Sequence, residues 1–268
     1  NALKKLTPGA VHVSVDDHSA QYLKSIQGVE LHHVKGPHPA GNVGVQIHNI
    51  DPINRGERVW TIGVEDVATI GTLFLTGEYH AERTIAVAGS EATNRKYYKT
   101  KIGANVSDLI GQVSDEVRII SGDVLTGTQL SNNQYVGFFE NEVSLIPEGK
   151  NYRLFGWLPF TYNNIHSHSH TSLSWLFPNK KYTPTTNLNG EERALVVTGE
   201  MEEVLPMDIY PMQLIKACMA GDIEKMENLG IYEVAPEDFA AVEYVNTSKI
   251  EIQEVIRLGL DLMITEVG

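Results

Sequence analysis

Apolar and polar residues follow two different periods in the first third of the chain. Val-rich stretches at 10–16 and 29–36 are typical of strands, and the short apolar run 83–90 ends in glycine. Apolar residues at helical spacing between these runs predict helices at 16–28 and 64–80. The strand and helix order predicts a mostly parallel sheet with two covered faces, of which these three strands are only a part.

The pattern changes at about residue 93. Short alternating runs separated by glycine-containing turns predict strands at 96–104, 116–123, 134–149 and 151–158. One short helix is expected at 106–113, with Ser107 as its N-cap. A few strands around one helix are typical of a β-grasp module.

The last hundred residues divide into an irregular part and a helical part. Residues 159–205 are crowded with Asn, Thr, Pro, His and Ser, whereas 206–268 carry apolar residues at helical spacing, with Ser248 expected to cap the last helix. The expected fold class is α/β plus α+β. Its expected parts are a partial α/β domain (1–92), a β-grasp domain (93–158), an irregular linker (159–205) and a C-terminal helical domain (206–268).

The amino-acid composition excludes several kinds of binding partner and of metal or disulfide site. The 268 residues carry a formal net charge of −13, which repels phosphates, so no nucleic acid partner is expected. Cys218 is the only cysteine, which excludes an internal disulfide and an all-cysteine metal cluster and fits a small buried residue in a reducing compartment. No apolar run approaches the ~18 residues of a membrane span. The chain begins at Asn1 rather than at methionine, and we expect further residues upstream.

Three histidines raise the question of a metal site. His166, His168 and His170 would share one face of a strand, but alternate residues lie nearly ~7 Å apart, so the outer two cannot reach one ion without a bend. A solvated polar loop is therefore the favoured interpretation, and no metal is predicted. The carboxylates Glu202 and Glu203 would point apart, and no catalytic residues are predicted in the chain.

The most distinctive stretch is GPHPAGNVGVQIHNIDP, residues 36–52. Its first part, residues 36–44, is named the glycine turn below. Prolines stiffen this turn, glycines allow a close approach, and the helix that we expect next could offer its first amides to an anion or a carbonyl oxygen. The pattern is neither a Rossmann nor a phosphate-binding loop, so the residues alone favour a structural turn rather than a ligand site. The candidate contact residues are Gly36, Pro37, His38, Pro39, Gly41 and Gly44.

Four segments in order along the chain carry a resemblance to a known family. They are GPHPAGNVGVQIHNIDP, VWTIGVEDVATIGTLFLTGEYHAERTIAVAG, KIGANVSDLI with EVRIISGDVLTGTQ, and MEEVLPMDIYPMQLIKACMAGD. From about residue 10 to the end, the chain resembles the A subunit of the bacterial Na+-translocating NADH:quinone reductases. That protein is longer, which implies an upstream part with a barrel-sandwich region and the first half of the α/β domain.

The resemblance implies a fold related to the flavin-bearing subunit of respiratory complex I. It implies a partial Rossmann-like α/β domain, a β-grasp domain of the soluble-ligand-binding type and a helical domain. Related subunits hold iron–sulfur clusters on closely spaced cysteines there, whereas this chain has Asn246, Thr247 and Ser248 in a stretch that we expect to be helical. The resemblance implies that the chain binds no flavin, nicotinamide or cluster, and that flavin, iron–sulfur and NADH (NAD) chemistry lies on other subunits.

The implied role is that of a peripheral subunit on the cytoplasmic face of the bacterial inner membrane. Its partners would be the other subunits of the sodium-pumping complex, especially the membrane subunits, and its part would be quinone binding or complex assembly. Ubiquinone or menaquinone needs an apolar slot with a donor at each carbonyl, and His38 could supply one donor.

Two other functions stay open at this point. The chain could be a stand-alone β-grasp module that binds a small soluble ligand without a redox role. It could also be an independent hydrolytic or metal enzyme built around His166, His168 and His170. Stoichiometric metal would favour the enzyme, and failure to associate with membrane subunits would favour the stand-alone module.

Overall fold

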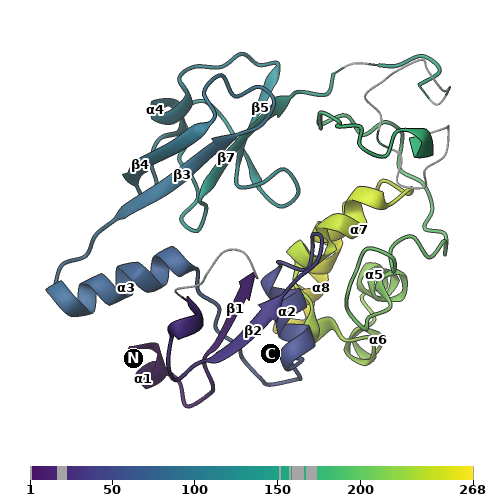
Figure 1. The fold of residues 1–268 in the computed structure, drawn as a ribbon. Coiled ribbons are helices and arrows are strands. Elements are labelled where there is room, and N and C mark those ends of the chain that lie inside the picture. Colours follow the sequence, from purple (N-terminus) through teal and green to yellow (C-terminus); the bar gives the residue numbers. More distant parts are fainter. Residues whose placement is uncertain are drawn as a thin grey trace. The chain divides into compact units, whose positions relative to one another are not determined.

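The computed structural model describes residues 2–16, 23–150, 152–156, 158, 166 and 174–267. The chain forms two compact units. The first unit combines Asn1–His80 with Glu192–Gly268, and the second unit is Ala81–Glu191 (Figure 1). The mixed α/β fold class expected from the sequence is confirmed, with a small parallel sheet, a five-stranded mixed sheet and a helical C-terminal region.

The N-terminal part of the first unit is a small α/β arrangement. Strands β1 and β2 lie side by side and are parallel, as the sequence pattern predicted, and His12 lies opposite Glu30 (Figure 1). The elements of this part are α1 (Leu3–Leu6), β1 (His12–Asp16), η1 (Leu23–Ser25), β2 (Glu30–Val34), α2 (Val43–Ile50) and α3 (Val64–Thr76). Within the described residues, none of these helices, nor any later one, is both long and apolar enough to cross a membrane.

Two expectations for this part need correction. Of the helix predicted over 16–28, the described residues form only the short 3-10 helix η1. The strand predicted at 83–90 does form, as β3 (Glu82–Ala88), but it belongs to the sheet of the second unit and not beside β1 and β2. Its buried, alternating side chains face the core of that unit, a choice of partner that local pattern does not encode.

The second unit is a five-stranded mixed sheet with one short helix. Its strand order is β4-β3-β7-β5-β6, in which β3 and β7 are parallel and the other neighbours are antiparallel. Besides β3, its elements are β4 (Lys96–Lys101), α4 (Val106–Ile110), β5 (Val117–Ser121), β6 (Thr128–Leu130), β7 (Glu142–Pro147) and, late in the unit, the 3-10 helix η2 (Ser174–Leu176). The buried core comprises Ile85, Val87, Val106, Leu109, Ile119, Val136, Val143 and Leu145.

Local details of the second unit differ from the sequence prediction. The cap of α4 is Asn105 rather than Ser107, because the Asn105 Oδ1 accepts a hydrogen bond of 2.9 Å from the Ser107 backbone N–H. The run 134–149 contains a strand only over β7. No strand is present among the described residues of 151–158, where the chain turns at 154–156.

An ion pair closes the end of the β5–β7 pair. The Arg118 guanidinium donates from Nε at 2.9 Å and from Nη2 at 2.6 Å to the two carboxylate oxygens of Glu148. The Thr186 hydroxyl adds a third hydrogen bond, at 2.7 Å. These contacts, the Arg118 hydrogen bond first, lower the pKa of Glu148.

Glu148→Gln is expected to lower the free energy of unfolding by about 1 to 2 kcal/mol at pH 7. The two hydrogen bonds from Arg118 to a carboxylate are replaced by a weaker contact between Arg118 and a neutral amide. A lowered folded pKa stabilises the protein above the ordinary glutamate pKa of about 4.3 and loses that contribution as the pH falls through the folded value. The difference between wild type and variant should therefore shrink in acid. Urea unfolding at pH 7 and pH 3 measures it. Glu91→Gln, on an exposed side chain of the same unit, is the control, and equal losses in both variants would refute the assignment.

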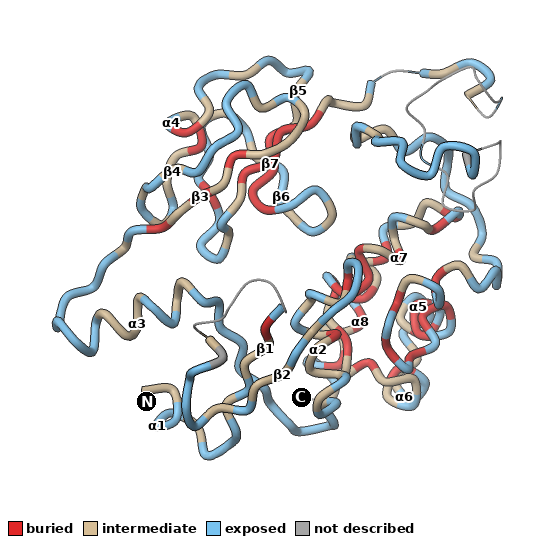
Figure 2. Tube along the Cα trace, in the orientation of Figure 1, coloured by how far each residue is buried: buried red, intermediate tan, exposed pale blue. Residues whose placement is uncertain are grey.

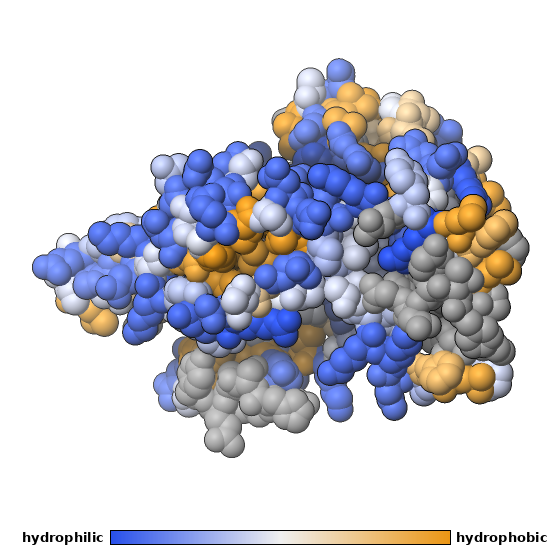
Figure 3. Space-filling model, turned by 90° about the horizontal axis from the view of Figure 1, so that it is seen from above, coloured by the Kyte–Doolittle hydropathy of each residue, from blue (hydrophilic) through white to orange (hydrophobic). Residues whose placement is uncertain are grey.

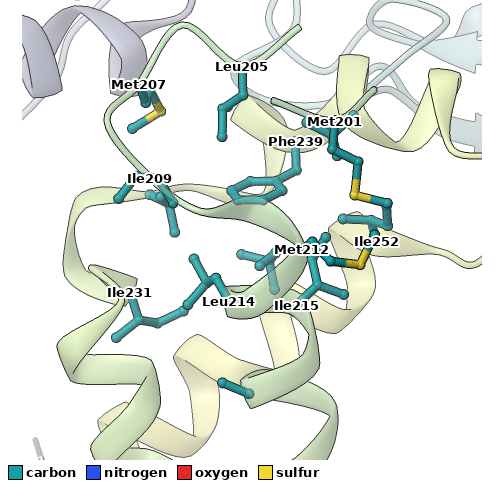
Figure 4. Close-up of a cluster of buried hydrophobic side chains, with 14 of the residues drawn as sticks. Met201, Leu205, Met207, Ile209, Met212, Leu214, Ile215, Ile231, Phe239 and Ile252 are labelled. Atoms are coloured by element: carbon teal, nitrogen blue, oxygen red, sulfur yellow. The ribbon is translucent and has the colours of Figure 1, made fainter. Parts of the chain in front are cut away.

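The C-terminal part of the first unit is a helical cluster with a large core. Its elements are α5 (Pro211–Ala220), α6 (Ile223–Asn228), η3 (Ile231–Glu233), η4 (Pro236–Phe239), α7 (Ala240–Val245) and α8 (Ile252–Glu266). Burial concentrates in these helices, notably α5 and α8 (Figure 2). Phe239 is fully buried in the middle of the apolar cluster (Figure 4). Val45 of α2 belongs to the same cluster, so the N-terminal and C-terminal segments share one core.

Asn246, Thr247 and Ser248 lie between two helices and not within a helical stretch, contrary to expectation. Helix α7 ends at Val245, and α8 begins only at Ile252, with Glu251 rather than Ser248 at its N-cap position. Between them, the buried Ser248 donates from its hydroxyl to the Ala194 carbonyl at 3.0 Å. The break therefore holds residues 193–194 against the helical cluster through Ser248.

The single cysteine is a packing residue. Cys218 lies partly buried on α5 and packs against the apolar cluster of the helical part. Burial raises the pKa of its thiol to about 11, so the thiol is protonated at neutral pH. A Cβ on Gly259 of α8 would overlap the Cys218 sulfur, so these two helices approach closely there.

Candidate functional site

The glycine turn connects β2 to α2 and is folded by its own backbone. The Ala40 N–H donates to the Pro37 carbonyl at 3.0 Å, and the Asn42 N–H donates to the Pro39 carbonyl at 2.8 Å. Gly36 has φ 154°, a conformation that favours glycine and turns the chain out of β2. The turn thus places the first residues of α2 against the helical cluster.

An acidic side chain from the helical cluster lies at the start of α2. The fully buried Asp238 of η4 faces the Asn42 side chain and the Val45 N–H, and its Oδ2 accepts a hydrogen bond of 3.0 Å from the Ala235 N–H. Burial raises the pKa of the Asp238 carboxyl, and the N–H groups around it oppose that rise by favouring the ionised form. A carboxylate of the chain itself therefore occupies the helix start that the sequence offered to an external anion.

Glycine is required where the two segments meet. A Cβ on Gly44 would overlap both carboxylate oxygens of Asp238. Beside this contact, the Asn42 side-chain amide donates to the Glu237 carbonyl at 3.0 Å. The close approach that glycine allows at position 44 is therefore used by the protein's own chain.

His48 forms a second link between α2 and the C-terminal part. Its Nδ1–H donates to Glu233 Oε2 at 2.8 Å, and its Nε2 accepts from the Asp208 backbone N–H at 3.0 Å. These two partners fix the neutral tautomer with the proton on Nδ1. Only 10% of the His48 side chain is exposed, whereas its partners Glu233 and Asp208 lie nearer the surface.

The candidate contact residues of the glycine turn divide into two groups. Pro39 is buried and Gly44 lies against Asp238, so these two face the protein itself. The remaining four residues are exposed at the crest of the turn, namely Gly36, Pro37, His38 and Gly41. Sequence reasoning missed Glu233, Asp238 and His48 as members of this site. The only local trace of them is an acidic pair after Pro236, which looks like an ordinary helix start.

The β-grasp unit offers little space to a small ligand. A hollow in the second unit, lined by residues that include Val87, Tyr98 and Leu109, has a volume of about 50 Å³. Small-molecule sites have about 300 to 1,000 Å³, so this hollow does not favour a stand-alone ligand-binding module. The rings of His166 and Tyr182 form a T-shaped contact, with their centres 5.3 Å apart. His168 and His170 fall outside the described residues.

Large apolar side chains are exposed on both units. Trp60 is 91% exposed, and Leu75 on α3 is 88% exposed. In the second unit, Phe138 and Phe139 are exposed side by side, with ring centres 4.9 Å apart. Apolar residues accordingly form several orange patches on the face shown in Figure 3. Contiguous exposed apolar groups are typical of surfaces that meet another protein, whereas single exposed apolar residues are common on any protein.

A partial parallel α/β layer shares its core with a helical cluster, and a five-stranded β-grasp unit is inserted in the sequence between the two segments. This combination defines a modular protein of the soluble-ligand-binding β-grasp class. Residues 1–79 match the family model described as NqrA second alpha/beta domain, and residues 84–132 match the one described as NQRA C-terminal domain. The chain is a homologue of NqrA, the A subunit of the Na+-translocating NADH-quinone reductase.

Individual relatives give the extent of the similarity. The A subunit of the Vibrio campbellii reductase is 36% identical over 267 residues, which cover 98% of this chain and 59% of the relative. That of Saccharophagus degradans is 38% identical over 261 residues, covering 96% and 58%. That of Neisseria meningitidis serogroup B is 36% identical over 262 residues, covering 97% and 58%. The chain thus spans less than two thirds of the length of these curated relatives.

Proposed function

We propose that the chain serves as part of a peripheral subunit of a sodium-pumping NADH:quinone reductase, on the cytoplasmic face of the membrane. Its contribution is structural support of quinone binding and docking to the other subunits, while NADH, flavin and iron–sulfur chemistry lies elsewhere in the complex. The observation that carries this proposal is the similarity to NqrA over 96–98% of the chain.

The geometry of the glycine turn supports a contact role for its crest. Asp238 and Glu237 hold the turn from inside, whereas Pro37 and His38 are exposed. A contact loop that is held rigidly loses little conformational entropy when it binds. The His38 ring could donate a hydrogen bond to a quinone carbonyl or to a polar group of another polypeptide.

The exposed apolar side chains support docking. Trp60 and Leu75 lie in or beside α3, which has no buried residue in the described structure. A helix with apolar residues on its surface gains stability when another polypeptide covers them. Membrane subunits of the complex, or a further part of the same polypeptide, are the partners that this proposal assigns to such surfaces.

Label transfer from a photoreactive quinone tests the quinone contact in the intact complex. We expect labelled peptides within residues 30–60, and a several-fold loss of that label in His38→Ala with assembly unchanged. His33→Ala, a nearby exposed histidine on β2, is the matched control and should keep the label. A label confined to other subunits would refute the quinone contact, and recovery of the chain free of membrane subunits would refute the docking role as well.

A further inference from the structure

Two histidines and a glutamate converge on one face of the small parallel sheet. His12 of β1 lies directly opposite Glu30 of β2, and His32 follows Glu30 by two residues. Side chains two residues apart on a strand share a face, so the register brings all three together. Their ligand atoms all lie within 4.8 Å of one another. Within the described part of the chain, this is the one such group.

The distances match the spacing of ligands around a small cation. His12 Nδ1 lies 3.0 Å from His32 Nε2 and 3.5 Å from Glu30 Oε2. A tetrahedral zinc ion with bonds of about 2.05 Å requires its ligand atoms to be about 3.3 Å apart. The three groups therefore need shifts of only a few tenths of an ångström at the two measured edges to bind one ion.

A hydrogen bond between the His12 and His32 rings leaves the Glu30 carboxylate without a proton donor of its own in this group. One N–H between His12 and His32 satisfies the contact between those two nitrogens, but the Glu30 carboxylate is directed at the same His12 nitrogen. A cation in the middle would satisfy both imidazole lone pairs and the carboxylate charge together. The rings are tilted by 35° with centres 5.2 Å apart, which leaves their nitrogen edges facing one another.

We propose that His12, Glu30 and His32 form a site for a zinc-type divalent transition-metal ion. Two imidazoles and one carboxylate suit such an ion, whereas Mg²⁺ and Ca²⁺ prefer oxygen ligands alone. His12 and Glu30 are exposed, so water completes the coordination and the ion enters directly from solvent. The ion ties the start of β1 to β2, two strands that have no third strand beside them in the described structure.

This site is distinct from the possible metal site at His166, His168 and His170, and it does not depend on the proposed quinone role. The sequence draws attention to His166, His168 and His170 because they are close in the chain. His12 and His32 are twenty residues apart, and only strand pairing brings them together. Failure of the quinone proposal would leave the metal site untouched.

Titration of the 268-residue chain with Zn²⁺, followed by calorimetry and equilibrium dialysis, tests the site. We expect one tight equivalent, with affinity reduced at least about tenfold in each of His12→Asn, Glu30→Gln and His32→Asn, since removal of second-sphere partners alone costs 10- to 100-fold. His33→Asn, next to His32 but on the opposite face of the strand, should bind as the wild type does. Circular dichroism confirms that each variant folds.

A second readout separates this site from the other histidines. Saturating Zn²⁺ should raise the thermal midpoint of the wild type and of the triple variant His166→Asn, His168→Asn, His170→Asn, but not that of His12→Asn. Either of two results would overturn the proposal. One is Zn²⁺ affinity unchanged by the β1 and β2 substitutions, and the other is a tight equivalent that disappears only in the triple variant.

Discussion

Gly44→Ala is expected to lower the free energy of unfolding by about 2 to 3 kcal/mol, although alanine is normally the better helix residue. The added Cβ would overlap the Asp238 carboxylate. That carboxylate cannot simply move aside, because it is fully buried and accepts a hydrogen bond from Ala235. Urea unfolding followed by circular dichroism measures the loss.

Two further variants isolate the cause. Gly71→Ala, in the interior of α3, adds a Cβ that would meet no atom within 4 Å. It should therefore stabilise the chain by about 0.5 to 1 kcal/mol. In an Asp238→Ala background, Gly44→Ala should cost much less than in the wild type, because the group it overlaps is gone. If Gly44→Ala and Gly71→Ala changed the free energy of unfolding in the same direction, the proposed overlap between position 44 and Asp238 would be contradicted.

His48→Ala is expected to cost about 1 to 2 kcal/mol, because it removes two hydrogen bonds made by a side chain that is only 10% exposed. The Glu233 carboxylate would lose its donor, and the Asp208 backbone N–H would lose its acceptor. Thermal and urea unfolding of the purified chain measure the loss. If the Asp208 amide hydrogen exchanges more slowly in the wild type than in the variant, the lost stability is assigned to the hydrogen bond between Asp208 and His48.

His38→Ala is the matched control for His48→Ala, since His38 is exposed at the crest of the glycine turn. It should change stability by no more than about 0.5 kcal/mol. The two histidines then separate by role, with His48 acting on folding and His38 on quinone labelling. Comparable destabilisation by both substitutions would show that the division between the inner and outer sides of the turn is wrong.

The contacts of the glycine turn change the role that its sequence suggests. Its sequence indicates a close approach and a helix start open to a ligand. In the folded unit, Gly44 and the start of α2 face Asp238, a residue 194 positions later in the chain. What remains for an external partner is the crest at Pro37 and His38.

The stretch between α7 and α8 shows why local pattern can mislead. The sequence places Asn246, Thr247 and Ser248 in a stretch that is expected to be helical, and it predicts Ser248 as the N-cap of the last helix. The chain instead leaves the helix at Asn246, whose Oδ1 accepts a hydrogen bond of 2.9 Å from the Ser248 N–H. Asn and Ser side chains compete with helical hydrogen bonds in this way, and the distant Ala194 carbonyl adds to the alternative.

The sequence by itself determined where several elements lie: the strands β1, β2 and β5 and the apolar face of α8 all follow from side chains that must leave water together. Tertiary structure alone decided which strand joins which sheet, which residue fills the start of α2 and which histidines meet. β3 joined the second sheet, Asp238 reached Gly44, and His12 met His32. Those choices depend on contacts between residues far apart in the chain, and no local period of apolar residues records them.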